Sequence, residues 1–144
     1  MQTTSAIFTQ RRVVEFHETD AAGIIHFSNV FLWMESAEMA FLRDRKVPIL
    51  SISKTTGRGW PRVAAGAQFM APLRFEDQIE IRLWLGDVGD TSIHYRFEIW
   101  RMNGPGEPEC AAAGEMTNVY ITCSTAGGKL KPTRIPADVR EKLK

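Results

Sequence analysis

A long apolar segment without helix breakers constrains the fold of this chain more than any other feature. Residues 30–42 contain no Gly or Pro, and their apolar side chains fall on nearly every side of a helix. Such a helix has to be buried almost all round. We predict a helix of about 14 residues that ends near 43–46, where cations suit the helix dipole, and before Pro48.

The rest of the chain shows a period of two, which is typical of half-buried strands. Residues 79–85 and 93–99 alternate apolar and polar side chains on either side of a turn at 86–90, so we predict an antiparallel hairpin. Three weaker stretches of the same alternation predict further strands, near 12–17, 63–69 and 117–121. A stretch rich in Gly and Pro predicts a turn at 103–108, and the tail predicts a short helix at 137–144.

These elements predict an α+β fold in which an antiparallel sheet of about five strands wraps around one long central helix. The length of 144 residues suits a single domain, 1–144. One sheet leaves part of an apolar helix uncovered. We therefore expect the chain to self-associate.

The composition excludes several classes of function. Lys and Arg number 18 against 17 Asp and Glu, a net charge of +1 that does not suit a nucleic-acid partner. No apolar run suits a signal peptide or a membrane span, so we expect a cytoplasmic protein without a membrane partner. Cys110 and Cys123 lack metal-ligand or redox spacing and are expected to be free thiols, and the three His supply no metal site.

The segment 18–29, ETDAAGIIHFSN, gathers Glu18, Asp20 and His26 just before the predicted helix. Unpaired N–H groups at a helix start attract a polarised carbonyl oxygen, as in an oxyanion hole. Asp20 is placed to act on that carbonyl as nucleophile or general base, and Gly23 allows a tight turn. The structural alternative is that Ser28 or Asn29 caps the helix while Asp20 orders the loop.

Two stretches carry a family resemblance. The first is Thr-Asp-Ala-Ala-Gly-Ile-Ile at 19–25, followed by two ring-bearing residues, Ser-Asn and a helix with Glu35; the second is Ala-Pro-Leu-Arg-Phe-Glu-Asp at 71–77. In this order they resemble the 4-hydroxybenzoyl-CoA thioesterase family of hot-dog fold acyl-CoA thioesterases. The resemblance implies a hot-dog fold, a homodimer or homotetramer with its sites at a subunit interface, and an acyl-CoA or aroyl-CoA substrate.

The resemblance also implies roles for individual residues. Asp20 matches the family's catalytic aspartate, and the backbone N–H of Phe27 matches the amide that polarises the thioester carbonyl. Gly23 and Asn29 match the turn glycine and the helix-start asparagine. His26-Phe27 departs from the Tyr-His of many relatives, so His26 receives no family role. The implied reaction is hydrolysis to a free acid and CoA, which needs no metal or other cofactor.

Alternatives stay open at this point. Glu35 on the helix is a second candidate base, and His26 with Glu35 is the nearest pair for a hot-dog hydratase or dehydratase. A non-catalytic acyl-CoA-binding module is the third possibility. Glu38 is expected to form a salt bridge or hydrogen bond at a subunit contact, because an ionised carboxylate on an apolar helix needs a partner. Phe27, Trp33 and Trp60 are acyl-pocket candidates, although aromatic residues more often belong to a core.

Overall fold

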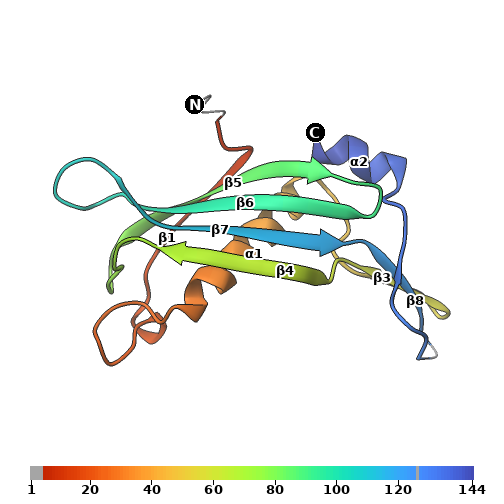
Figure 1. Ribbon diagram of the computed structural model, residues 1–144, viewed down its shortest axis with the longest axis horizontal. Helices are drawn as coiled ribbons and strands as arrows, with labels where there is room; N and C mark the ends of the chain where they lie inside the picture. The colour runs from red at the N-terminus through yellow and green to blue at the C-terminus, as the bar shows by residue number, and fades with distance from the viewer. Residues whose placement is uncertain (1–4, 126) are drawn as a thin grey trace.

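One antiparallel sheet and one long helix dominate the computed structural model, which describes residues 5–125 and 127–144. The helix α1 (Ser28–Asp44) lies behind the sheet in Figure 1. The five strands run in the order β1 (Phe8–Val13), β5 (Gln78–Val88), β6 (Ser92–Arg101), β7 (Glu109–Val119) and β4 (Arg62–Phe69). All neighbouring pairs are antiparallel, which confirms the predicted α+β arrangement.

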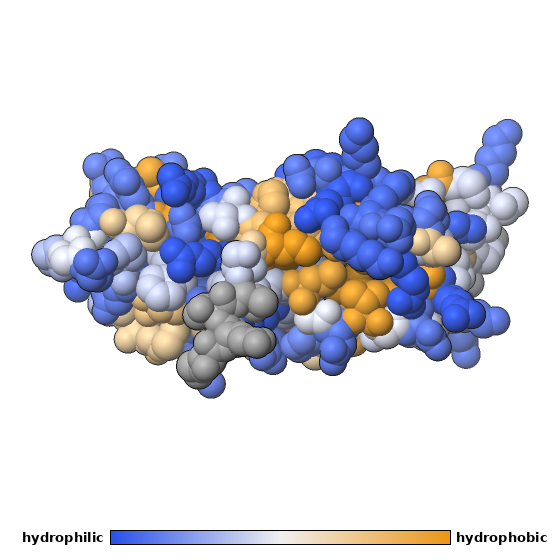
Figure 2. Space-filling model, turned by 90° about the horizontal axis from the view of Figure 1, so that it is seen from above, coloured by the Kyte–Doolittle hydropathy of each residue, from blue (hydrophilic) through white to orange (hydrophobic). Residues whose placement is uncertain are grey.

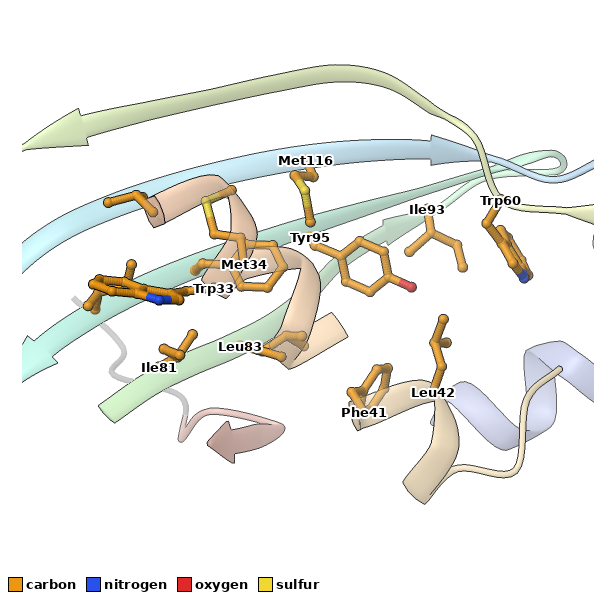
Figure 3. Close-up of a cluster of buried hydrophobic side chains, with 14 of the residues drawn as sticks. Trp33, Met34, Phe41, Leu42, Trp60, Ile81, Leu83, Ile93, Tyr95 and Met116 are labelled. Atoms are coloured by element: carbon orange, nitrogen blue, oxygen red, sulfur yellow. The ribbon is translucent and has the colours of Figure 1, made fainter. Parts of the chain in front are cut away.

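The core lies between α1 and the inward face of the sheet. Figure 3 shows Trp33, Met34 and Phe41 of α1 pointing toward side chains of β5 and β6 such as Leu83 and Tyr95. These side chains are at most 1% exposed. Burying a large apolar side chain contributes about 1.5–3 kcal/mol, so this contact holds the helix on the sheet.

Helix α1 begins two residues before the predicted segment, and the single chain buries only one side of it. Leu32 remains 59% exposed, and Glu35 is exposed as well. Burial almost all round is therefore wrong for one chain, because the sheet reaches only one side of the helix.

The predicted hairpin is confirmed as β5 and β6, which pair from Ile79↔Arg101 to Val88↔Ile93. The predicted turn at 103–108 joins β6 to β7, and the tail forms α2 (Ala137–Leu143), which buries Val139 and Leu143. Seen from above in Figure 2, the surface is mostly hydrophilic, with apolar side chains gathered near its middle. No helix in the described part of the chain is long and apolar enough to cross a membrane.

The first strand was predicted wrongly at 12–17. It is β1, which ends at Val13, and residues 16–18 form the 3-10 helix η1 (Phe16–Glu18). The chain leaves the sheet here because Glu18 and Glu15 form a reciprocal capping box that starts the short helix. The strand predicted at 117–121 is likewise divided, between the end of β7 and the start of β8 (Ile121–Ser124).

A second, four-stranded sheet was not predicted. It runs in the order β2 (Ser51–Ile52), β3 (Thr56–Gly59), β8 and β9 (Lys131–Pro132). None of these strands exceeds four residues, so the two-residue period has no length over which to become visible.

Candidate functional site

The segment 19–25 forms a closed loop at the N-terminal end of α1. An isolated antiparallel bridge joins Thr19 to Ile25. The N–H of Asp20 donates to the carbonyl of Ile24 at 2.9 Å, and the N–H of His26 donates to the carbonyl of Glu18 at 2.9 Å. Two bonds at the base of the loop therefore fix where its tip can lie.

Asp20 presents an exposed carboxylate at this loop. Its Oδ1 accepts the N–H of Ala22 at 2.8 Å, and its carbonyl accepts the N–H of Gly23 at 3.0 Å. Gly23 has a φ of 76°, in the left-handed region that favours glycine. The glycine thus lets the chain reverse within three residues while the carboxylate stays at the surface.

The two stretches that carry the family resemblance meet in space. The N–H of Ile25 donates to the carbonyl of Leu73 at 2.9 Å, and Nη1 of Arg74 lies 3.3 Å from the carbonyl oxygen of Gly23, to which it donates. Arg74 is held in turn, because its N–H donates to Asp77 Oδ2 at 2.8 Å. The turn at 74–77 therefore braces the loop from the side opposite α1.

Phe27 is the residue before the first turn of α1, and its N–H has no acceptor among residues 5–125 and 127–144. Neither predicted cap forms in the expected way. Ser28 Oγ pairs with His26 Nδ1 at 2.7 Å, whereas Asn29 donates its amide to the carbonyls of Glu18 and His26 at 2.8 and 3.2 Å. The N–H of Phe27 is thus a free donor at the helix start, next to the closed loop 19–25.

His26 and Glu35 have different partners. The His26 ring contacts Ser28 and lies 4.7 Å from the ring of Phe27, centroid to centroid. The carboxylate of Glu35 lies 3.7 Å from the guanidinium of Arg62 on β4. Within the described ranges, no hydrogen bond or ion pair joins His26 to Glu35. The chain does not form the acid-histidine pair that the hydratase alternative needs.

Glu38 lies in the core, with no exposed surface. It forms a salt bridge to Arg62 and accepts a hydrogen bond from Asn118. The predicted salt bridge is therefore confirmed, but its expected place at a subunit contact is wrong, because both partners belong to the same chain and Glu38 is buried within it. Burial raises the pKa of Glu38, and Arg62 and Asn118 lower it by less. This group holds β4 to α1 and lies away from solvent.

The aromatic candidates separate by exposure. Trp33 and Trp60 are 1% and 6% exposed and belong to the core. Phe27 and Phe69 are 59% and 52% exposed, and their rings face each other edge-on at 6.4 Å. The sequence analysis did not identify Phe69 as a site residue, because it lies 42 positions after Phe27 and only the fold of β4 brings the two rings together. No cluster of three metal-binding side chains occurs in the part of the chain that the structure describes.

A central helix on one five-stranded antiparallel sheet, with an acidic loop at the start of that helix, defines a hot-dog protein. The family model of the thioesterase-like superfamily matches residues 14–143. The chain belongs to this superfamily, and by class it is a thioester hydrolase.

Individual relatives agree with this assignment. A presumed esterase of Aquifex aeolicus (strain VF5) is 32% identical over 139 residues, which cover 95% of this chain and 98% of that protein. The 4-hydroxybenzoyl-CoA thioesterase of Pseudomonas sp. (strain CBS-3) is 22% identical over 92% of this chain and 94% of its own length. Among solved structures, the dynemicin thioesterase, described with bound polyene, superposes with a TM-score of 0.80 at 26% identity, covering 94% of each chain.

Proposed function

We propose that this protein hydrolyses an acyl-CoA or aroyl-CoA thioester to a free carboxylic acid and CoA, with Asp20 as the catalytic carboxylate. One observation carries the proposal. The closed loop 19–25 carries the exposed carboxylate of Asp20 and leads directly into the start of α1, where the Phe27 N–H has no acceptor among the described residues. The family supplies the thioester, since its members include enzymes named for CoA thioesters.

The position of the Phe27 N–H at the helix start supports its proposed role as the donor that polarises the thioester carbonyl. The free N–H of Phe27 lies at the positive end of the dipole of a 17-residue helix. A thioester carbonyl that accepts this N–H becomes more electrophilic, and the donor is stronger toward the oxyanion that forms next. Loss of one such donor typically costs 100- to 1,000-fold in rate, about 2.7–4 kcal/mol.

Asp20 can hydrolyse the thioester by either of two chemical routes. As a general base, Asp20 takes a proton from water as the water attacks the carbonyl carbon, the tetrahedral oxyanion expels CoA thiolate, and Asp20 then gives its proton to that thiolate. As a nucleophile, the carboxylate attacks the carbonyl itself and expels the thiolate, leaving a mixed anhydride that water then hydrolyses. Both routes deliver the acid and regenerate the carboxylate.

A single turnover in H₂¹⁸O separates the two routes. Attack of water on the Asp20 carbon of an anhydride places ¹⁸O in the peptide that contains Asp20, which mass spectrometry detects. Label in the acid product with none in the peptide means that water attacks the acyl carbon, of the thioester or of an anhydride. In that case, absence of an acyl-enzyme on Asp20 in a rapidly quenched turnover supports the general-base route.

The exposed rings of Phe27 and Phe69 form a wall next to the proposed oxyanion donor. An aromatic or otherwise flat acyl group can stack against such rings more favourably than a short alkyl group. We therefore propose that aroyl-CoA thioesters are better substrates than acetyl-CoA.

We also propose that the working unit is a homodimer or a homotetramer built from it. Seven of the eight residues of β4 are exposed, and β4 is an edge strand that pairs only with β7 in this sheet. An antiparallel second copy at this edge pairs the free backbone groups and covers Val63, which is 63% exposed. In that arrangement the start of the partner's β4 lies near Phe69, at the proposed acyl site.

A panel of acetyl-, fatty acyl-, benzoyl- and naphthoyl-CoA tests the function. We expect release of free thiol, fastest with an aroyl group. A change in acyl unsaturation without thiol release shows a hydratase instead, and tight binding of every thioester without turnover shows a binding module.

A further inference from the structure

Glu18 is the first residue of the segment 18–29, and the proposed chemistry does not use its carboxylate. We propose that Glu18 is a positioning residue that holds the Asp20 loop on the first two turns of α1, through Asn29 and Trp33. This inference rests on the proposed function.

The main chain of Glu18 makes the first link. Its carbonyl oxygen accepts the N–H of His26 at 2.9 Å and the side-chain amide of Asn29 at 2.8 Å. Asn29 is in the first turn of α1 and is only 9% exposed. Glu18 therefore joins both ends of the loop to the helix start at a single oxygen.

The side chain of Glu18 makes the second link, to the next turn of the helix. Glu18 Oε1 accepts the indole N–H of Trp33 at 2.9 Å, and Oε2 accepts the N–H of Glu15 at 2.8 Å. Arg12 completes the set with a salt bridge to Oε1, and its guanidinium carbon lies 5.2 Å from the centre of the Trp33 ring. Three donors thus surround a carboxylate whose side chain is 6% exposed.

These contacts favour positioning over stability alone. A buried carboxylate loses its hydration, and replacing such a polar group by apolar side chains often leaves a protein as stable or more so. A directional set of bonds instead fixes geometry. Trp33 is buried in the core, and Glu18 is two residues before Asp20, so the bonds set the distance from the Asp20 carboxylate to the Phe27 N–H. Rates depend steeply on such distances.

Trp33→Phe tests the link, and Trp100→Phe is its matched control. Each substitution removes an indole N–H that donates to a glutamate at 2.9 Å, Glu18 or Glu98, and each indole has an arginine over its ring. Trp100 lies on β6 and its polar partners are on the outer face of the sheet, so its loss leaves the loop unchanged.

We expect Trp33→Phe to lower kcat by about tenfold or more, with KM changed by less than about threefold, whereas Trp100→Phe keeps kcat. Activities are corrected for the folded fraction. Amide hydrogen exchange at residues 19–26 should accelerate in Trp33→Phe and stay at the wild-type rate in Trp100→Phe. If the bond from Trp33 to Glu18 only stabilises the fold, Tm falls in both variants. In that case Trp33→Phe changes neither kcat nor hydrogen exchange in the loop more than Trp100→Phe does.

Glu18→Gln covers the case in which Trp33→Phe does not fold. If its carbonyl still accepts from Trp33 and Arg12, its NH₂ group faces the N–H of Glu15, where two donors meet, so the same kcat loss and faster loop exchange are expected. If both variants keep wild-type kcat while Asp20→Asn is inactive, the positioning role is wrong and the proposed function stands. If the wild type hydrolyses no thioester, the proposed function fails and this role fails with it.

Discussion

At the scale of single residues, Asp20 and Glu35 are both exposed carboxylates, and their neighbours distinguish them. Asp20 has a backbone N–H on one oxygen and a free helix-start donor nearby, whereas Glu35 faces the guanidinium of Arg62. A cation beside a carboxylate stabilises its negative charge but also occupies the oxygens that would act on a substrate. The surroundings of Asp20 suit catalysis, and those of Glu35 suit an ion pair.

Asp20→Asn should lower kcat by at least about 100-fold, the usual scale for losing a positioned acid-base group, with little change in Tm. Stability is kept because the asparagine oxygen still accepts the N–H of Ala22. Glu35→Gln is the control and should lower kcat only slightly. Steady-state thiol release measures both. An inactive Glu35→Gln beside an active Asp20→Asn would mean that the catalytic carboxylate lies on α1.

Glu80 gives a pH-dependent prediction. Burial alone raises the pKa of Glu80, but bonds and charges from Arg82 and Arg11 outweigh it and hold the pKa below the usual range. A lowered folded-state pKa adds stability above the ordinary carboxyl pKa of about 4.3, and this is lost as pH falls through the folded-state value. Glu80→Gln should thus cost about 1 kcal/mol at pH 7 and progressively less below pH 4 to 5. Urea unfolding at several pH values measures the difference; an equal cost at pH 7 and pH 3.5 contradicts it.

At the scale of elements, the contact of α1 with the sheet depends on a close approach at β7. A Cβ on Gly114 would lie 2.6 Å from Sδ of Met34 and 3.0 Å from the carbonyl oxygen of Gly66. Met34 is fully buried, so its side chain has little room to move aside. The absence of a side chain at this position lets the helix lie directly on the strand.

Gly114→Ala should therefore destabilise the fold by about 1–2 kcal/mol through overpacking. Gly66→Ala on the neighbouring strand is the matched control, since a Cβ there meets nothing within 4 Å. Thermal unfolding compares the two variants. Equal Tm values for both would show that Met34 repacks freely and that the approach of α1 to β7 is not limiting.

At the scale of the whole molecule, the exposed edge strand β4 is the surface through which we propose that the protein self-associates. The apolar side chains on and beyond this strand, Val63, Phe69 and Met70, are each more than half exposed, an arrangement that isolated edge strands normally avoid. The same strand carries Phe69 toward Phe27. Assembly and the proposed acyl site are therefore coupled through one element.

Val63→Asp should shift the protein toward monomer and reduce kcat, because the proposed antiparallel pairing buries each new carboxylate near Phe69 of the other copy without a partner charge. Leu130→Asp is the control, since Leu130 is equally exposed at 62% but lies beside the second sheet. Light scattering at micromolar concentration should show a wild-type dimer or a multiple of it. A monodisperse wild-type monomer with full activity would contradict the shared site.

The sequence by itself determined the elements whose pattern is local and long. The apolar run of α1, the alternation of β5 and β6, and the turn at 103–108 follow from periods and breakers in the local sequence. The turn predicted at 86–90 is wrong in its bounds, because β5 continues to Val88 across an irregularity in the pairing and the turn is 89–91. The acidic loop was also visible, because its short-range turn depends on Gly23 and on contacts within seven residues.

Only the tertiary structure decided where distant segments meet. Three contacts join residues that sequence spacing does not relate. The loop 19–25 meets the segment 71–77, the Phe69 ring lies beside that of Phe27, and Trp33 donates to Glu18. The second sheet has the same cause, since its two- to four-residue strands exist only where a partner strand offers its backbone. The early end of β1 is instead local, because the capping box of Glu15 and Glu18 starts a short helix there. Local periodicity specifies which face of an element is apolar, whereas packing against the whole fold selects the particular residue that covers it.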